Sequence, residues 1–163
     1  MTDINSIKDE QWATFFGDQD DYYLNVVDEV KAGKIVVFNV YAFFFGLCWM
    51  LYRRMYLVCA LAIGVLYVEN WVEELVFALY FPSVTDEIRT VVSNLVWASA
   101  VGCFANWFYI QHARRQISKV LAQQQETEQT LVEIEAKGGI SWMPIIIILS
   151  LVLFSLLMLR FGA

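Results

Sequence analysis

The fold of this chain is decided by the stretch Phe38-Asn-Val-Tyr-Ala-Phe-Phe-Phe-Gly-Leu-Cys-Trp-Met-Leu-Tyr-Arg-Arg-Met-Tyr56. It is too apolar and too aromatic to face water, and it ends near two arginines that belong in water or at a lipid headgroup. The chain is acidic before this stretch and consists mostly of long apolar runs after it. This change of character predicts a small membrane protein whose N-terminal region lies outside the bilayer.

The composition favours membrane spans over a large soluble core. Hydrophobic residues make up 59% of the 163 residues, against roughly 45–50% in an average soluble protein, and they are gathered into runs. The formal net charge of −6 gives no support for nucleic-acid binding. No basic leader precedes the first apolar run near Ile35, so we expect the chain to enter the membrane through its own spans.

Residues 1–34 are expected to form an acidic, amphipathic, cytoplasmic region of two short helices that lie on the membrane or on the rest of the protein. Apolar and aromatic side chains recur at helical spacing in both halves. Aromatic residues on an acidic background make a plausible protein contact, so we expect four of them to dock a partner protein. These four are Trp12, Phe15, Tyr22 and Tyr23.

Residues 35–54 are expected to form an aromatic helix that lies in the membrane interface or enters the bilayer and returns. Its apolar part, residues 35–52, has 18 residues, near the lower limit of about 17 for a span. Only Arg53 and Arg54 separate it from the next apolar run, and so short a polar turn does not easily join two full antiparallel spans. The alternative in which residues 35–52 cross the membrane stays open.

Residues 55–110 are expected to form a helical hairpin of two membrane spans. Each span contains two small residues four positions apart, a pattern that lets helix backbones approach closely. The pairs are Ala60 with Gly64 and Ala98 with Gly102. We therefore expect the two spans to pack against each other along these faces.

Polar side chains interrupt this hairpin. Residues 55–68 are cleanly apolar but reach only about 21 Å, whereas the hydrocarbon core is roughly 30 Å thick. Glu69 then either lies inside the far half of the bilayer or marks the point where the helix meets water. In the first case it would bind a proton or cation, or pair with Asn94 or Arg89. Asn106 is a further polar residue inside the second span.

The remainder of the chain is predicted to form a polar segment and a last span. Residues 111–141 are expected to continue the second span as a solvated cytoplasmic helix that ends at a Gly138-Gly139 hinge. Residues 142–163 are almost uniformly apolar and are expected to form the C-terminal membrane span.

The distribution of Lys and Arg predicts the orientation in the membrane. With three spans, nine of the eleven cationic residues lie in the cytoplasm, whereas a fourth span at residues 35–52 would leave only six there. We therefore expect an all-α membrane protein with three transmembrane helices and an interfacial or re-entrant aromatic helix. Four transmembrane helices are the alternative. The N-terminus is expected inside and the C-terminus outside.

A group of cationic and aromatic residues is expected near the cytoplasmic surface. They either anchor the spans or form one pocket for an anionic lipid headgroup. The group consists of Trp49, Tyr52, Arg53, Arg54, His112, Arg114 and Arg115.

The search for enzyme motifs is negative. The sequence contains no Gly-rich phosphate loop, no H-E-x-x-H and no G-x-S-x-G motif. The three cysteines lie inside apolar runs without a C-x-x-C pair, and His112 is the only histidine, so no disulfide or metal site is indicated. We expect no catalytic residue, cofactor or metal.

The central stretch resembles the signature of the bacterial domain of unknown function 2628 membrane proteins. The resemblance rests on Asn39-x-x-Ala-Phe-Phe-Phe-Gly-x-x-Trp-x-Leu-Tyr-Arg-Arg-Met-Tyr56, on Asn106-x-x-Tyr-x-x-His112 and on Lys137-Gly-Gly-Ile-Ser141, with Tyr22-Tyr23 and Gly33 as a similar lead-in. Leu47-Cys48 departs from the Pro-Leu pair of many members, so a kink is not predicted there. The resemblance implies an integral protein of the bacterial inner membrane and brings no reaction or cofactor.

Three functions are compatible with these features. The first is a non-enzymatic accessory or scaffold subunit that contacts other membrane-protein subunits or a second copy of itself. The second is a small transport or channel component that uses Glu69. The third is a protein that binds anionic membrane lipids. We favour the first, because three spans with few polar residues leave little material for a path across the membrane.

Overall fold

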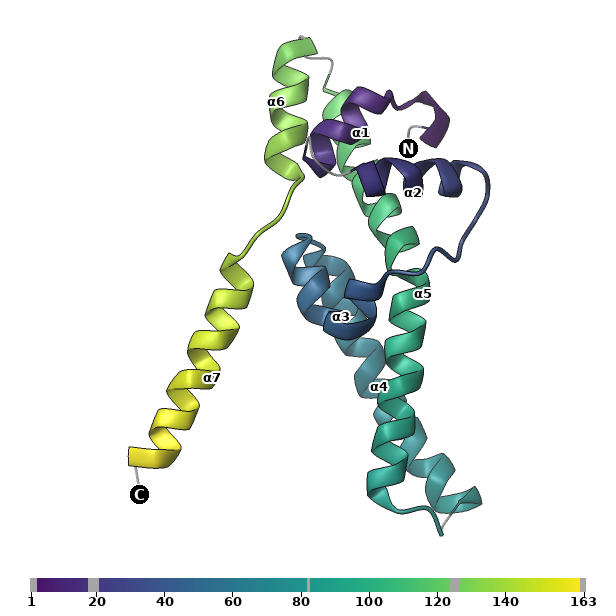
Figure 1. Cartoon of the computed structure of the whole chain (residues 1–163), viewed down its shortest axis with the longest axis vertical. Coiled ribbons are helices and arrows are strands. Elements are labelled where there is room, and N and C mark those ends of the chain that lie inside the picture. Colours follow the sequence, from purple (N-terminus) through teal and green to yellow (C-terminus); the bar gives the residue numbers. More distant parts are fainter. Residues whose placement is uncertain (1–2, 18–20, 82, 124–126, 162–163) are drawn as a thin grey trace.

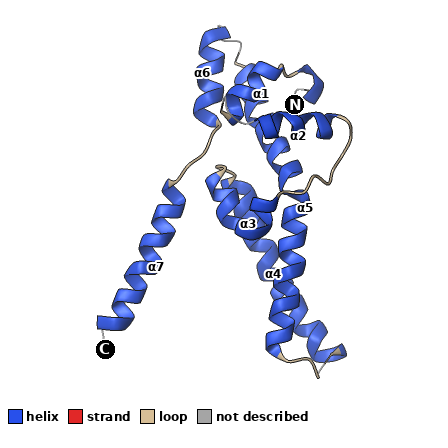
Figure 2. Cartoon of the chain, in the orientation of Figure 1, coloured by secondary structure: helices blue, strands red, loops and turns tan. Residues whose placement is uncertain are grey.

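The computed structural model describes residues 3–17, 21–81, 83–123 and 127–161. These residues form a 3-10 turn and seven α-helices, without a strand among them. The helices are α1 (Asp9–Phe16), α2 (Asp21–Lys31), α3 (Val40–Tyr52), α4 (Tyr56–Tyr80), α5 (Asp86–Leu121), α6 (Thr127–Lys137) and α7 (Met143–Phe161). Figures 1 and 2 show a helical cap at one end, from which α4, α5 and α7 extend in the same general direction.

The expected number of membrane spans is confirmed. Three helices are long and apolar enough to cross a bilayer, namely α4, α5 and α7. The helix α3 has 13 residues and would reach only about 20 Å, too short for a crossing. An all-α membrane protein with three spans and a shorter aromatic helix is therefore the observed architecture.

The cap contains the main hydrophobic core. It is built from α1, α2, α6 and the C-terminal part of α5, whose apolar faces meet. Its buried side chains include Trp12, Phe15, Phe16, Tyr23, Val27, Tyr109, Ile117 and Ile134. The prediction that Trp12, Phe15 and Tyr23 form an exposed docking surface is therefore wrong: their large apolar area is removed from water inside the chain.

The helix α5 joins the cap to the membrane part. Its 36 residues extend about 54 Å, which is longer than a bilayer crossing needs, so that its N-terminal part can span the membrane while its C-terminal part reaches into the cap. The predicted single solvated helix over residues 111–138 is wrong in two respects. The helix ends at Leu121, and a separate helix α6 begins at Thr127. Ala113 and Ile117 are buried rather than solvated, because α1, α2 and α6 surround this continuation.

The helix α3 is bent in its middle and folds against α5. Asn39 begins it by accepting a hydrogen bond from the Ala42 amide at 2.8 Å. Gly46 then adopts φ 44° and ψ −114°, which divides α3 into two short segments. This kink was not predicted, because the sequence lacks a proline there. Gly46 allows the bend instead, because a positive φ costs glycine little free energy.

The turn after α3 redirects the chain into α4. Arg54 has φ 57°, and the Met55 amide donates to the Met50 carbonyl at 2.9 Å. The turn is therefore closed by backbone hydrogen bonds, and α4 starts directly at Tyr56. This explains how two arginines suffice as a connection: α3 is a short bent helix and need not cross the membrane.

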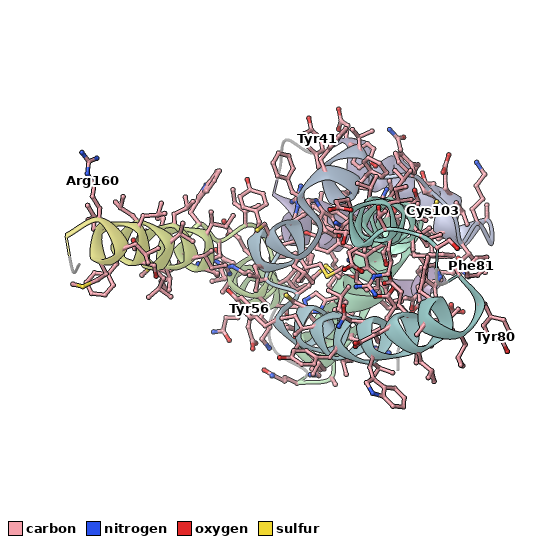
Figure 3. The ribbon with its side chains drawn as sticks, turned by 90° about the horizontal axis from the view of Figure 1, so that it is seen from below. Tyr41, Tyr56, Tyr80, Phe81, Cys103 and Arg160 are labelled. Atoms are coloured by element: carbon pink, nitrogen blue, oxygen red, sulfur yellow. The ribbon has the colours of Figure 1, made fainter. Side chains whose placement is uncertain are left out.

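The helix α7 extends away from the others (Figure 1). It is attached near its start, where the Ser141 amide donates to the Tyr52 carbonyl at 2.8 Å and the Trp142 ring meets the Tyr52 ring at 4.9 Å. Its span Met143–Arg160 buries no residue inside the chain. Figure 3, viewed from below, shows its side chains projecting outward along its length.

The small-residue pairs do not form the predicted contact between α4 and α5. A Cβ atom built on Gly64 would meet nothing within 4 Å, and Ala60 is exposed. Gly102 is buried, but a Cβ atom there would lie 2.8 Å from the Phe38 ring. The closest packing of α5 in the membrane part is therefore with the start of α3, since Gly102 leaves room for aromatic side chains rather than for α4.

Candidate functional site

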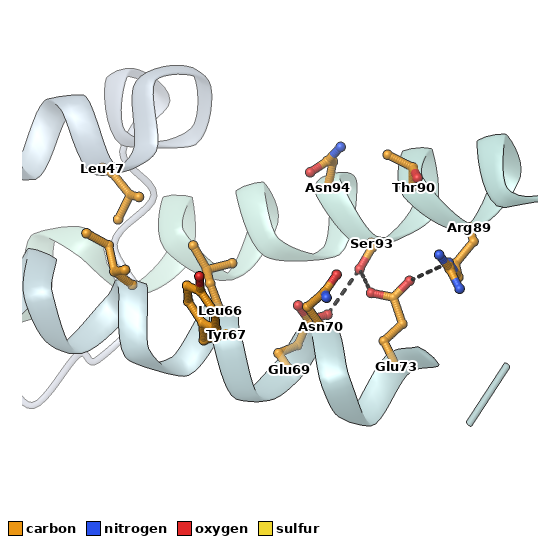
Figure 4. A pocket seen from close by; sticks show the side chains of 11 residues that line it. Leu47, Leu66, Tyr67, Glu69, Asn70, Glu73, Arg89, Thr90, Ser93 and Asn94 are labelled. Carbon is orange, nitrogen blue, oxygen red and sulfur yellow. Dashed lines mark hydrogen bonds and ion pairs between the residues drawn. The ribbon is translucent and has the colours of Figure 1, made fainter. Parts of the chain in front are cut away.

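A polar cavity lies between α4 and α5 in the membrane part of the molecule. Its volume is about 430 Å³. Seven of its lining side chains are polar or charged, and they come from both helices: Glu69, Asn70, Glu73, Arg89, Thr90, Ser93 and Asn94. Figure 4 shows Glu69 and Glu73 on one helix facing Ser93 and Arg89 on the other. Polar contacts thus replace the apolar packing predicted for this helix pair.

The spacing of these residues along each helix explains why they meet. Glu69 and Glu73 are four residues apart, as are Arg89 and Ser93, so each pair shares one helix face. The Ser93 hydroxyl contacts the Glu69 carboxylate at 3.0 Å and also the Glu73 carboxylate. Arg89 Nε lies 3.7 Å from Glu73 Oε1. The predicted pairing of Glu69 with Arg89 or Asn94 is not found: Arg89 pairs with Glu73, and Glu69 accepts a hydrogen bond from Ser93.

The cavity carries an excess of negative charge. Two carboxylates face one guanidinium, which Asp86 also approaches at 3.5 Å. Asn94 lines the cavity, although no hydrogen bond joins it to Glu69 among the described residues. Such a site suits a positively charged group. The described part of the chain has no group of three or more His, Cys, Asp or Glu side chains arranged for a metal ion.

Asn106 takes part in a second polar arrangement, at the junction of the cap and the membrane part. The Asn39 amide donates to the Asn106 side-chain oxygen at 2.7 Å. The Asn106 amide in turn donates to the Tyr22 hydroxyl at 2.7 Å and to the Val37 carbonyl at 3.1 Å. Both asparagines are buried. The sequence indicated Asn106 as an intramembrane polar residue but did not indicate Asn39 as its partner. Asn39 could have been recognised as an N-cap, because it directly precedes an apolar helix.

Tyr22 is the exception among the four aromatic residues expected to dock a partner. Its side chain is half exposed, at 44%, whereas its ring packs edge-on against Tyr23 at 5.0 Å. Its hydroxyl is committed to Asn106. Tyr22 therefore connects α2 to α5 and retains only part of the surface that the prediction gave it.

The residues predicted to form one headgroup pocket make separate contacts with different helices instead. The Arg53 guanidinium lies 4.4 Å from the centre of the Tyr23 ring and 5.4 Å from that of Tyr109, a cation–π arrangement. The Trp49 ring packs against Tyr109 at 5.8 Å. Arg54 donates to the Ala136 carbonyl at 2.9 Å. These side chains thus hold α2, α3, α5 and α6 together.

The cationic residues on α5 have different surroundings. Arg114 donates to Gln111 at 3.5 Å, and the His112 ring lies 6.5 Å from the Phe15 ring. Burial, followed by the positive charges of Arg115 and Lys119, lowers the pKa of His112. Arg115 is exposed and points away from the core.

One comparison with known proteins gives a match. No curated protein and no solved structure matches this chain. A family model described as "Protein of unknown function (DUF2628)" matches residues 7–115. These residues include α1, α2, α3 and α4 and most of α5, and thus both polar arrangements described above. The chain belongs to this DUF2628 family, as the resemblance of its central stretch indicated.

Proposed function

We propose that the protein is a non-enzymatic accessory or scaffold subunit of a larger assembly in the bacterial inner membrane. The observation that carries this proposal is the isolation of α7, whose span buries no residue inside the chain. The span of α4 is only 6% buried. Helices in lipid associate through packing with other helices, and these two leave most of their surface for partner helices.

The charge distribution supports an orientation with the cap in the cytoplasm. Arg53, Arg54 and the cationic end of α5 belong to the cap side, and Arg160 lies near the far end of α7. The positive-inside rule then gives a cytoplasmic N-terminus and a C-terminus on the opposite side. Cysteine accessibility in intact cells, at residue 5 and after residue 161, tests this orientation.

Purification of the tagged protein from its native membrane in a mild detergent tests the scaffold role. We expect a native mass that exceeds one chain and the same partner subunit or second copy in repeated preparations. A matched variant replaces residues 145–159 by an unrelated Leu/Ala span of equal length. It should lose the assembly and keep the stability of the cap. A single chain that carries only lipid would reject the scaffold role.

A second function, a small transport component, is favoured by the cavity between α4 and α5. Its excess carboxylate lies within a membrane helix, where an unneutralised charge is costly. Glu69→Gln is then expected to abolish proton or cation flux in proteoliposomes. Glu74→Gln, which changes an exposed carboxylate on the same helix, should leave the flux intact. Equal effects of the two substitutions would exclude this function.

A further inference from the structure

The cytoplasmic half of α5 has an exposed face opposite its core face. Five residues share it, because they are three or four positions apart: Phe104, Phe108, Gln111, Arg115 and Lys119. We call this set the α5 stripe. The residues that enter the core, such as Ala105, Tyr109, Ala113 and Ile117, lie on the other side of the helix. The stripe is therefore available to the surroundings of the protein along about four turns.

The two cations of the stripe have no neutralising partner within the part of the chain that the structure describes. Neither Arg115 nor Lys119 forms a hydrogen bond or an ion pair with a described residue. They are four residues apart on one helix face, and the positive charges of both lower the pKa of His112, after the larger effect of burial. Acidic residues predominate in the sequence, but none of the described ones forms an ion pair with these two cations.

The half of the stripe nearer the membrane part is apolar, and the half nearer the cap is cationic. Phe104 and Phe108 are 41% and 44% exposed and belong to the apolar segment that ends at Ile110. Arg115 follows Ile110 by about 7.5 Å along the helix. The polar headgroup layer is about 5–7 Å deep on each side of the hydrocarbon core. The Arg115 backbone therefore lies at the outer edge of this layer, and the long Arg115 and Lys119 side chains, which tilt toward the N-terminus of the helix, can reach back into it.

We propose that the α5 stripe binds an anionic phospholipid of the adjoining leaflet. The phosphate lies between Arg115 and Lys119, and an acyl chain follows Phe104 and Phe108. An acidic segment of a soluble protein would satisfy the two cations but would not reach the phenylalanines within the apolar layer. The matching order of apolar and cationic side chains therefore favours a lipid. This inference is independent of the scaffold role, since α7 takes no part in it.

Native mass spectrometry of the full chain tests the proposal. The protein is titrated with phosphatidylglycerol or with phosphatidylcholine of the same acyl chains. Each cationic side chain near an anionic headgroup contributes enough for about a fivefold preference. The double variant Arg115→Gln/Lys119→Gln should therefore lower the preference for phosphatidylglycerol by about 30-fold. Binding of phosphatidylcholine should change little.

A control variant removes the same charge elsewhere. Lys8→Gln/Lys34→Gln alters two exposed lysines of the N-terminal region and should keep the preference for phosphatidylglycerol. A second variant, Phe104→Ala/Phe108→Ala, should weaken the binding of both lipids. The proposal is overturned if the arginine–lysine variant keeps the wild-type preference, or if the control variant loses it equally. Loss of an acidic protein partner with unchanged lipid binding would also overturn it.

Discussion

Asn39 and Asn106, which are 67 positions apart in the sequence, share a buried side-chain hydrogen bond of 2.7 Å. The Asn39 backbone amide also donates to the Gly102 carbonyl at 2.8 Å. Two hydrogen bonds thus fix the start of α3 to one turn of α5. Through the Tyr22 hydroxyl, the same pair fixes α2. The cap and the membrane part are therefore joined by polar contacts as well as by the continuous α5 helix.

Replacing Asn106 should disconnect this junction. Asn106→Leu leaves the buried Asn39 side-chain amide without its acceptor, at a cost of about 1–3 kcal/mol for the unsatisfied group, and also removes the donor to the part-buried Val37 carbonyl. We expect a lower thermal unfolding midpoint of the purified protein in detergent. Asn94→Leu is the matched control, because Asn94 is an exposed residue of the same helix. Equal midpoints for the two variants would contradict this role of Asn106.

Trp12 should behave as a core residue rather than as a docking residue. Its side chain is 0% exposed, and truncation of a buried tryptophan typically costs about 3–5 kcal/mol. Trp12→Ala should increase hydrogen–deuterium exchange in α1, α2 and α6. Trp71, which is 67% exposed on α4, provides a control at which Trp→Ala leaves the cap protected. Normal protection in the Trp12 variant would restore the docking interpretation.

Gly138 should tolerate no side chain. A Cβ atom there would lie 2.0 Å from the Phe15 carbonyl oxygen, and the neighbouring Gly139 amide donates to that oxygen at 2.8 Å. Gly138→Ala therefore separates α6 from α1, and we expect faster proteolysis of the segment between α6 and α7. Gly64→Ala adds a methyl group in open space and should leave the digestion pattern unchanged.

Gly46 should be required for the bend in α3. Its φ of 44° with ψ of −114° costs a residue with a side chain about 1–3 kcal/mol. Gly46→Ala should lower the thermal unfolding midpoint. The control Cys48→Ala, at an exposed position two residues further on, should leave the midpoint unchanged. If the Gly46→Ala variant had unchanged stability, α3 would pack against α5 without requiring the positive φ at residue 46.

The sequence predicts the membrane part better than the cap. Apolar runs identify α4, α5 and α7 directly, because nothing but lipid or other helices can cover them. The pair Arg53-Arg54 also indicates that α3 does not cross. Trp12 and Phe15 were misassigned, since an amphipathic face looks the same whether it meets another protein or a distant part of its own chain. Their partner α6 lies in a segment whose polar composition predicts exposure to solvent.

The cavity was predictable only in part. Glu69 stands out as a charge after an apolar run, and Arg89 was named as one pairing for it. The meeting of Glu73 with Arg89 and Ser93 depends on the rotation of α4 relative to α5. The prediction had the two helices packing along the faces that carry Ala60, Gly64, Ala98 and Gly102. Gly102 instead contacts the side chains of Phe38 and Phe43. Small residues indicate a close approach without specifying which element makes it.

The packing of α1 against α6 has a consequence for biosynthesis. Because α1 ends at Phe16 and α6 begins at Thr127, ribosomes that add about 5–20 residues per second need roughly 5–20 s between them. During that interval Trp12 and Phe15 have no α6 to cover them, while α4 and α5 are being inserted. The α7 helix is not needed for cap closure. The nascent chain therefore carries an uncovered aromatic surface through membrane insertion, which is the period in which a chaperone would recognise it.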